Sequence, residues 1–140
     1  MSTLFPGTSA RGASAHLRLR RWLALDAVVT GVNGLAYLAL SGPLSRFLGL
    51  DSTLLLALGA LLLLYGAAVG AQARPQRPRP FWSLCIVEAN LGWVVLSIAA
   101  LALWLEPSTA GAVWIVLQAA VVATFAAAQY AALRAGARTR

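Results

Sequence analysis

Two acidic residues inside long apolar stretches are the side chains of this chain best suited to chemistry. The sequence contains only four acidic residues, and Asp26 and Glu88 both fall within such stretches. A charge in an apolar environment is unfavourable, so such a residue is expected to have a partner or a function. A carboxyl group withdrawn from water favours its neutral form, and it can hold or exchange a proton.

Uncharged polar and aromatic residues accompany these acids at helical spacing. One set is spaced i, i+4, i+7 and i+11, which places it on one face of a helix: Asp26, Thr30, Asn33 and Tyr37. A later stretch carries a similar set: Trp114, Gln118, Phe125 and Gln129. The candidate ligand-binding residues are therefore two acids and six neutral residues: Glu88, Asp26, Asn33, Asn90, Gln118, Tyr37, Trp93 and Trp114.

These residues predict a polar pocket between helices, with Glu88 and Asp26 as its acids. Such a pocket could bind a cation or a small amphipathic molecule, for which Trp93 and Trp114 offer aromatic faces. The alternative is a structural role, because buried amide side chains also join neighbouring helices by hydrogen bonds. Asp26 lies near the end of its stretch, where an arginine could pair with it, and for Glu88 both interpretations stay open.

The remaining reactive residues are too few to support catalysis or a metal site. The chain has one cysteine, one histidine and one methionine, which is too few for a haem or a four-ligand metal centre. It also lacks a nucleophile–base pair and a glycine-rich phosphate loop. We therefore expect no enzymatic activity, no cofactor and no bound metal.

The apolar stretches that carry these residues are long enough to span a membrane. Hydrophobic residues make up 60% of the 140 positions and charged residues 11%, against about 45–50% and about 25% in soluble domains. A chain this short cannot bury so much apolar surface in a soluble fold. Four stretches approach or exceed the roughly 20 residues that a spanning helix needs: 22–40, 53–73, 81–105 and 110–133. The sequence therefore predicts an all-α fold, a transmembrane four-helix bundle.

The arginines predict the orientation of this bundle. Ten of the eleven lie in the N-terminal segment, in the connector 74–80 or near the C-terminus, and the other is Arg46. Arginines collect in cytoplasmic segments, so both termini are expected in the cytoplasm and the protein in a bacterial plasma membrane. We expect a disordered tail over 1–17, a four-helix domain over 18–134 and a short tail over 135–140. The arginines flank spans, so they indicate contact with lipid head groups and no nucleic acid.

Two features bear on assembly. Asn33 and Asn90 are 57 residues apart, as are Gln72 and Gln129, which suggests two tandem two-helix repeats. Small residues, such as those around Gly66, allow helices to approach closely, either inside the bundle or between copies. The sequence therefore allows either a homo-oligomer or a complex with another membrane protein.

Three segments resemble a group of small, uncharacterised four-helix membrane proteins from bacteria with GC-rich genomes. They are 25–34 (LDAVVTGVNG), 90–93 (NLGW) with Ser97, and 114–119 (WIVLQA) continuing to Gln129. The resemblance implies the fold and a plasma-membrane location, and it brings no activity. A fainter similarity links the chain to SPW-type two-helix membrane repeats, although Ser41-Gly42-Pro43 stands where their Ser-Pro-Trp motif would be.

Two functions follow as expectations. The first is a non-enzymatic membrane protein that serves as an accessory or assembly subunit or binds a small lipophilic molecule. The alternative is a small proton-coupled transporter that uses Glu88. Membrane lipids are the expected partners in both cases.

Overall fold

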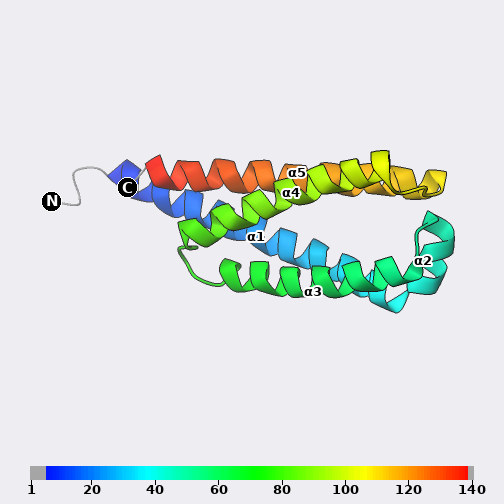
Figure 1. Ribbon diagram of the computed structural model, residues 1–140. Coiled ribbons are helices and arrows are strands. Elements are labelled where there is room, and N and C mark those ends of the chain that lie inside the picture. Colours follow the sequence, from blue (N-terminus) through cyan, green and yellow to red (C-terminus); the bar gives the residue numbers. More distant parts are fainter. Residues whose placement is uncertain (1–5, 139–140) are drawn as a thin grey trace.

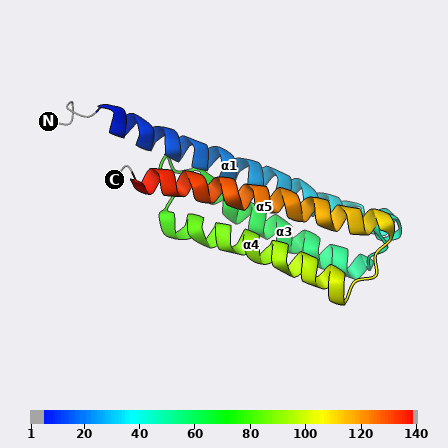
Figure 2. The same ribbon diagram turned by 90° about the horizontal axis from the view of Figure 1, so that it is seen from above.

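The structure, a computed structural model that describes residues 6–138, is a bundle of long helices. Four long helices run side by side, and a short fifth one packs across one end of the bundle (Figures 1 and 2). In chain order they are α1 (Pro6–Ala39), α2 (Ser41–Leu48), α3 (Ser52–Ala73), α4 (Pro80–Leu103) and α5 (Thr109–Arg138). The predicted all-α four-helix fold is thereby confirmed.

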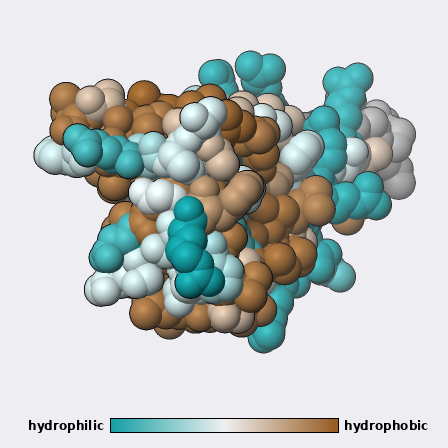
Figure 3. Space-filling view, turned by 90° about the vertical axis from the view of Figure 1, so that its right-hand side faces the viewer, coloured by the Kyte–Doolittle hydropathy of each residue, from teal (hydrophilic) through white to brown (hydrophobic). Residues whose placement is uncertain are grey.

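The four long helices give the protein the character of a multi-pass membrane protein. Each is long and apolar enough to cross a bilayer. Large apolar side chains such as Leu64, Val95 and Leu103 lie exposed on the outer flanks. Figure 3 looks onto the end that carries α2, and hydrophobic surface extends around the flanks of the bundle. These flanks are the surface that lipid tails would cover.

The first and last long helices extend beyond the predicted spans. Of the tail expected to be disordered, residues 6–17 are helical, and residues 1–5 lie outside the described part of the chain. α5 likewise continues to Arg138. The two extensions support each other, because Ala15 is buried and lies against Gly136 of α5. An apolar partner surface thus stabilises helix where the sequence composition indicated a tail.

The helices associate as two pairs. α1 packs along α3, α4 packs along α5, and the pairs meet mainly where α1 lies against α5. α3 and α4 have very little contact with each other. Each half of the expected repeat therefore forms one helix pair, although α2 has no counterpart in the second half.

Glycines bring α1 and α3 close together. A Cβ atom added to Gly34 would lie 2.8 Å from the carbonyl oxygen of Gly59. Gly66 is buried and meets α1 in the same way, so it packs inside the bundle. Close backbone approach of this kind is a common means of helix association in membranes.

The end of the bundle opposite the termini is fastened by backbone hydrogen bonds. α2 is followed by the C-cap residue Gly49, whose left-handed φ of 68° suits glycine. The amide of Ser108 donates to the Leu48 carbonyl over 3.0 Å, which joins α2 to the start of α5. Asp51 caps the start of α3, because its side chain accepts a hydrogen bond from the Leu54 amide.

Candidate functional site

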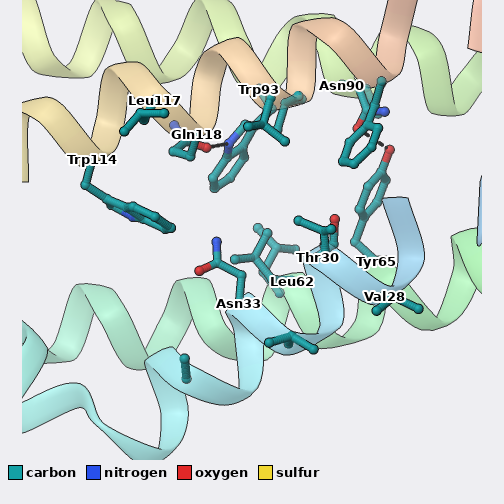
Figure 4. A pocket seen from close by; sticks show the side chains of 18 residues that line it. Val28, Thr30, Asn33, Leu62, Tyr65, Asn90, Trp93, Trp114, Leu117 and Gln118 are labelled. Atoms are coloured by element: carbon teal, nitrogen blue, oxygen red, sulfur yellow. Dashed lines mark hydrogen bonds between the residues drawn. The ribbon is translucent and has the colours of Figure 1, made fainter. Parts of the chain in front are cut away.

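A cavity of about 630 Å³ lies between the four long helices. Figure 4 shows side chains from opposite sides of the bundle pointing toward it. Most of its lining is aliphatic or aromatic, and the residues that carry polar atoms are Thr30, Asn33, Tyr65, Asn90, Trp93, Trp114 and Gln118. An apolar cavity with a few polar groups is the usual form of a small-molecule site.

Helical periodicity brings the lining residues together. On α1, Val29, Asn33 and Ala36 are spaced i, i+4 and i+7 and therefore share a face. On α5, Trp114 and Gln118 are one turn apart and also face the cavity. α1 and α5 thus each supply a stripe of apolar residues interrupted by an amide.

A buried hydrogen-bond network around Asp26 lies at one end of the cavity. The Asp26 carboxylate is 1% exposed. Its Oδ1 accepts from the Thr30 hydroxyl over 3.0 Å, and its Oδ2 accepts from Asn90 Nδ2 and Gln129 Nε2, both over 2.8 Å. Asn90 Nδ2 also donates to Gln129 Oε1 over 3.1 Å. Helices α1, α4 and α5 are therefore joined at one carboxylate.

Tyr65 adds α3 to this network. Its hydroxyl lies 2.9 Å from Asn90 Oδ1 and 3.2 Å from the Ile86 carbonyl oxygen, and it can donate to either acceptor. In the described part of the chain no buried side-chain nitrogen or oxygen lacks a partner. A network of this kind fixes the mutual positions of helices.

A second polar contact between α1 and α5 lies farther along the bundle. The Trp114 indole donates to the Tyr37 hydroxyl over 2.7 Å. Nearby, the Trp93 indole donates to Gln118 Oε1, and Gln118 Nε2 donates to the Ile115 carbonyl. Two hydrogen-bonded pairs, Asp26–Gln129 and Trp114–Tyr37, therefore join α1 to α5, and the cavity lies between them. We call these two pairs the polar crossbars.

Asn33 is the amide that these contacts leave free. It lines the cavity between the two crossbars, and its side chain points into the open space in Figure 4. Within the described residues its amide group has no hydrogen-bond partner, whereas the amides of Asn90 and Gln118 are engaged. Asn33 is therefore positioned to donate to, and accept from, a bound molecule.

The cavity reaches the outer surface of the bundle. Seven of its lining residues are at the same time exposed: Val28, Val29, Val32, Leu61, Ala89, Leu117 and Val121. All seven are aliphatic, and five of them come from α1 and α5. In a bilayer this opening faces lipid, which gives apolar molecules a lateral route into the cavity.

The structure places the eight candidate residues in three groups. Five line the cavity: Asn33, Asn90, Gln118, Trp93 and Trp114. Asp26 and Tyr37 are buried behind them and bind Asn90 and Trp114. Glu88 is exposed on α4 and is not part of the lining.

The position of Glu88 has a simple geometric reason. Successive residues of an α-helix are about 100° apart, so Glu88 points about 200° away from Asn90, two residues on. Asn90 occupies the inner face of α4, together with Ser83, Ile86 and Val87. The structure therefore separates Glu88 from the pocket to which its sequence position had assigned it.

Three members of the Asp26 network are absent from the predicted set: Thr30, Tyr65 and Gln129. Thr30 and Gln129 do fall on the polar stripes seen in the sequence, so their spacing was a usable signal. Tyr65 stands alone in an otherwise apolar stretch, and only the approach of α3 to Asn90 reveals its role.

The cavity presents apolar surface and the unpaired amide of Asn33 to any molecule that enters it. Among the described residues no three His, Cys, Asp or Glu side chains gather into a group that could hold a metal ion. Comparisons of the chain with protein-family models, curated proteins and solved structures find no match. The case for a function therefore rests on the geometry of the cavity.

Proposed function

We propose that this protein binds a small, neutral, lipophilic molecule within the membrane and is not an enzyme. The observation that carries the proposal is the laterally open apolar cavity with the unpaired amide of Asn33 inside it. An apolar body would fill the cavity, and one hydrogen-bonding group of the ligand would pair with Asn33.

The lining favours a neutral ligand. Its residues carry no formal charge, so an ionised head group would lose its hydration without gaining an ionic partner. Asp26 does not line the cavity, and its carboxylate already accepts three hydrogen bonds. An amide offers both a donor and an acceptor, so Asn33 suits a hydroxyl, carbonyl or amide group.

The two tryptophans act on the ligand through their ring faces. The indole N–H groups of Trp93 and Trp114 are bound to Gln118 and Tyr37. Their rings, which line the cavity, remain available to pack against an apolar or aromatic body.

Three probes of equal length test this proposal: 1-dodecanol, dodecane and dodecanoate. Ligands that bind the folded protein raise its thermal unfolding midpoint. We expect dodecanol, at equal mole fraction in detergent micelles, to raise the midpoint more than dodecane or dodecanoate. In Asn33→Leu the affinity for dodecanol should fall about fivefold, to the level of dodecane, because one hydrogen bond is lost.

Glu88→Gln is the matched control for Asn33→Leu. Glu88 lies outside the cavity, so its substitution should leave the preference for dodecanol unchanged. Equal responses to dodecanol and dodecane in the wild type would contradict the assignment of Asn33. Loss of binding in Glu88→Gln would instead favour the proton-coupled transporter.

A role as an accessory or assembly subunit is compatible with this site, and Glu88 supports it. Glu88 lies about 12 Å beyond the start of α4 at Pro80, on an exposed flank with Leu84 and Leu91. A carboxyl group at that depth is better accommodated against a polar group of a partner helix than against lipid. A partner membrane protein or a second copy would meet that need.

We also propose the orientation and the membrane. Both termini and the α3–α4 connector lie at the same end of the bundle (Figure 1), and this end carries nearly all the arginines. The positive-inside rule places it in the cytoplasm, and the resemblance to small bacterial four-helix proteins favours the plasma membrane. Reporter proteins fused to either terminus should both read as cytoplasmic. A periplasmic signal from either one would contradict this orientation.

A further inference from the structure

A second hollow lies between α3 and α4, near the arginine-rich end. It has a volume of about 500 Å³. This α3–α4 groove exists because the two helices have very little contact with each other. Its lining includes Ala68, Ala71, Gln72, Arg79, Trp82 and Ala89.

The groove is amphipathic along its length. Going from the connector into the membrane, Arg79, Gln72 and Trp82 give way to small apolar residues, among them Ala68 and Ala89. A groove with a cation at the mouth and an apolar floor matches a molecule with an anionic head and a hydrocarbon chain.

The connector brings positive charge to this end of the groove, where Arg79 is part of the lining. Arg74, Arg77 and Arg79 are exposed, and within the described residues their guanidinium groups have no hydrogen-bond or ionic partner. The backbone at the start of the connector is anchored, because Arg20 donates to the carbonyls of Ala73 and Arg74.

Gln72 contributes a further anchor for the connector. Its Nε2 donates to the Arg79 carbonyl over 2.8 Å and to the Ser83 hydroxyl over 3.2 Å. The backbone of Arg79 is therefore fixed beside the groove while its side chain stays available.

We propose that the α3–α4 groove binds one anionic phospholipid. Its phosphate would lie against Arg79, with Arg77 supplying a second positive charge, and one acyl chain would lie along Ala68 and Ala71. Arginine suits this role because its guanidinium matches phosphate geometry. Trp82, at the mouth, has the amphipathic ring typical of the head-group level.

Other occupants fit the groove less well. A zwitterionic lipid brings a cationic group toward the arginine cluster, and inorganic phosphate leaves the apolar floor uncovered. The acid nearest in sequence, Glu88, is exposed on α4 and is not among the groove residues, so it does not neutralise Arg79 there. Charge and shape together therefore select an anionic lipid.

Native mass spectrometry of the full chain, released from vesicles of equimolar phosphatidylglycerol and phosphatidylcholine, tests this proposal. We expect the wild type to retain one phosphatidylglycerol. The double variant Arg77→Gln/Arg79→Gln should lose this preference, since each arginine near a membrane surface contributes about a fivefold gain in affinity for anionic lipid.

The control is Arg11→Gln/Arg138→Gln, which removes the same charge from exposed positions at the same end of the bundle. It should retain the lipid as the wild type does. Equal loss of phosphatidylglycerol in both double variants would overturn binding in the groove, because the lipid would then be attracted by the total positive charge of this end of the bundle. Displacement of the lipid by inorganic phosphate alone would overturn the lipid assignment.

A second pair of variants tests the apolar half while every arginine stays in place. Ala68→Phe fills the groove, whereas Ala120→Phe adds the same side chain on an exposed position of α5 that lines neither hollow. Retention should fall only in Ala68→Phe. Unchanged retention in Ala68→Phe would overturn the acyl-chain position.

Discussion

Asp26 accepts hydrogen bonds from three uncharged side chains, and this set of partners defines its role. Thr30, Asn90 and Gln129 together occupy both oxygens of the carboxylate, which leaves Asp26 behind the cavity wall. The acid therefore positions Asn90, which does line the cavity. Sequence reasoning offered an arginine as one partner for Asp26, whereas the structure supplies neutral ones.

Removing the Asp26 carboxylate should destabilise the bundle. In Asp26→Leu the two amide donors and the Thr30 hydroxyl would lose their shared acceptor, so we expect a loss of about 2 kcal/mol in unfolding free energy. Denaturant titration in mixed micelles measures this loss. Glu106→Gln, which also removes one negative charge but from an exposed position, should change the stability by less than about 0.5 kcal/mol. Equal effects of the two variants would contradict a structural role for the network.

Five of the eight residues chosen from the sequence line the cavity, and Glu88 lies outside it. Asn33, Asn90, Gln118 and the two tryptophans were recognised because polar residues in apolar stretches are few. Glu88 was grouped with them because sequence position gives depth along a helix but not the direction of a side chain relative to its neighbours. That direction depends on which face of α4 packs against α5.

At the scale of elements, α1 and α3 are in close contact, and the cavity lies between this helix pair and the α4–α5 pair. The glycines make this contact, since Gly34 and Gly59 bring the two backbones together. α3 contributes to the cavity wall only through Leu61, Leu62 and Tyr65.

Gly34→Ala should therefore weaken the α1–α3 pair. The added methyl group would lie 2.8 Å from the Gly59 carbonyl oxygen, a backbone atom that cannot move alone. We expect a loss of about 1–3 kcal/mol in unfolding free energy, measured as above. Gly31→Ala is the matched control on the same helix, because a Cβ there meets no atom within 4 Å. A loss in Gly31→Ala as large as in Gly34→Ala would contradict the close contact.

The elements themselves were largely predictable. The length and apolar character of the stretches identified all four long helices, and the bounds of α3 and α4 differ from the predicted ones by at most two residues. The extensions of α1 and α5 were not predictable, because the packing of Ala15 against Gly136 of α5 depends on the approach of two helices that composition does not show.

At the scale of the whole molecule, the two polar crossbars bound the cavity along the bundle, and the lateral opening connects it to the outer surface. Asp26–Gln129 and Trp114–Tyr37 hold α1 to α5 on either side of the cavity, while exposed aliphatic residues border its opening. No single stretch of sequence contains this arrangement, since each crossbar joins residues that are far apart in the chain.

The most direct test of this account is to map where a lipophilic alcohol lies in the protein. A photoreactive hexadecanol that carries a diazirine in its chain would be irradiated with the protein in vesicles, and the modified peptides identified by mass spectrometry. We predict saturable labelling of 28–36 on α1 and 114–125 on α5, suppressed by excess 1-dodecanol. Labelling spread evenly over exposed flanks such as Leu64, Val95 and Leu103, without competition, would contradict an intramembrane binding site.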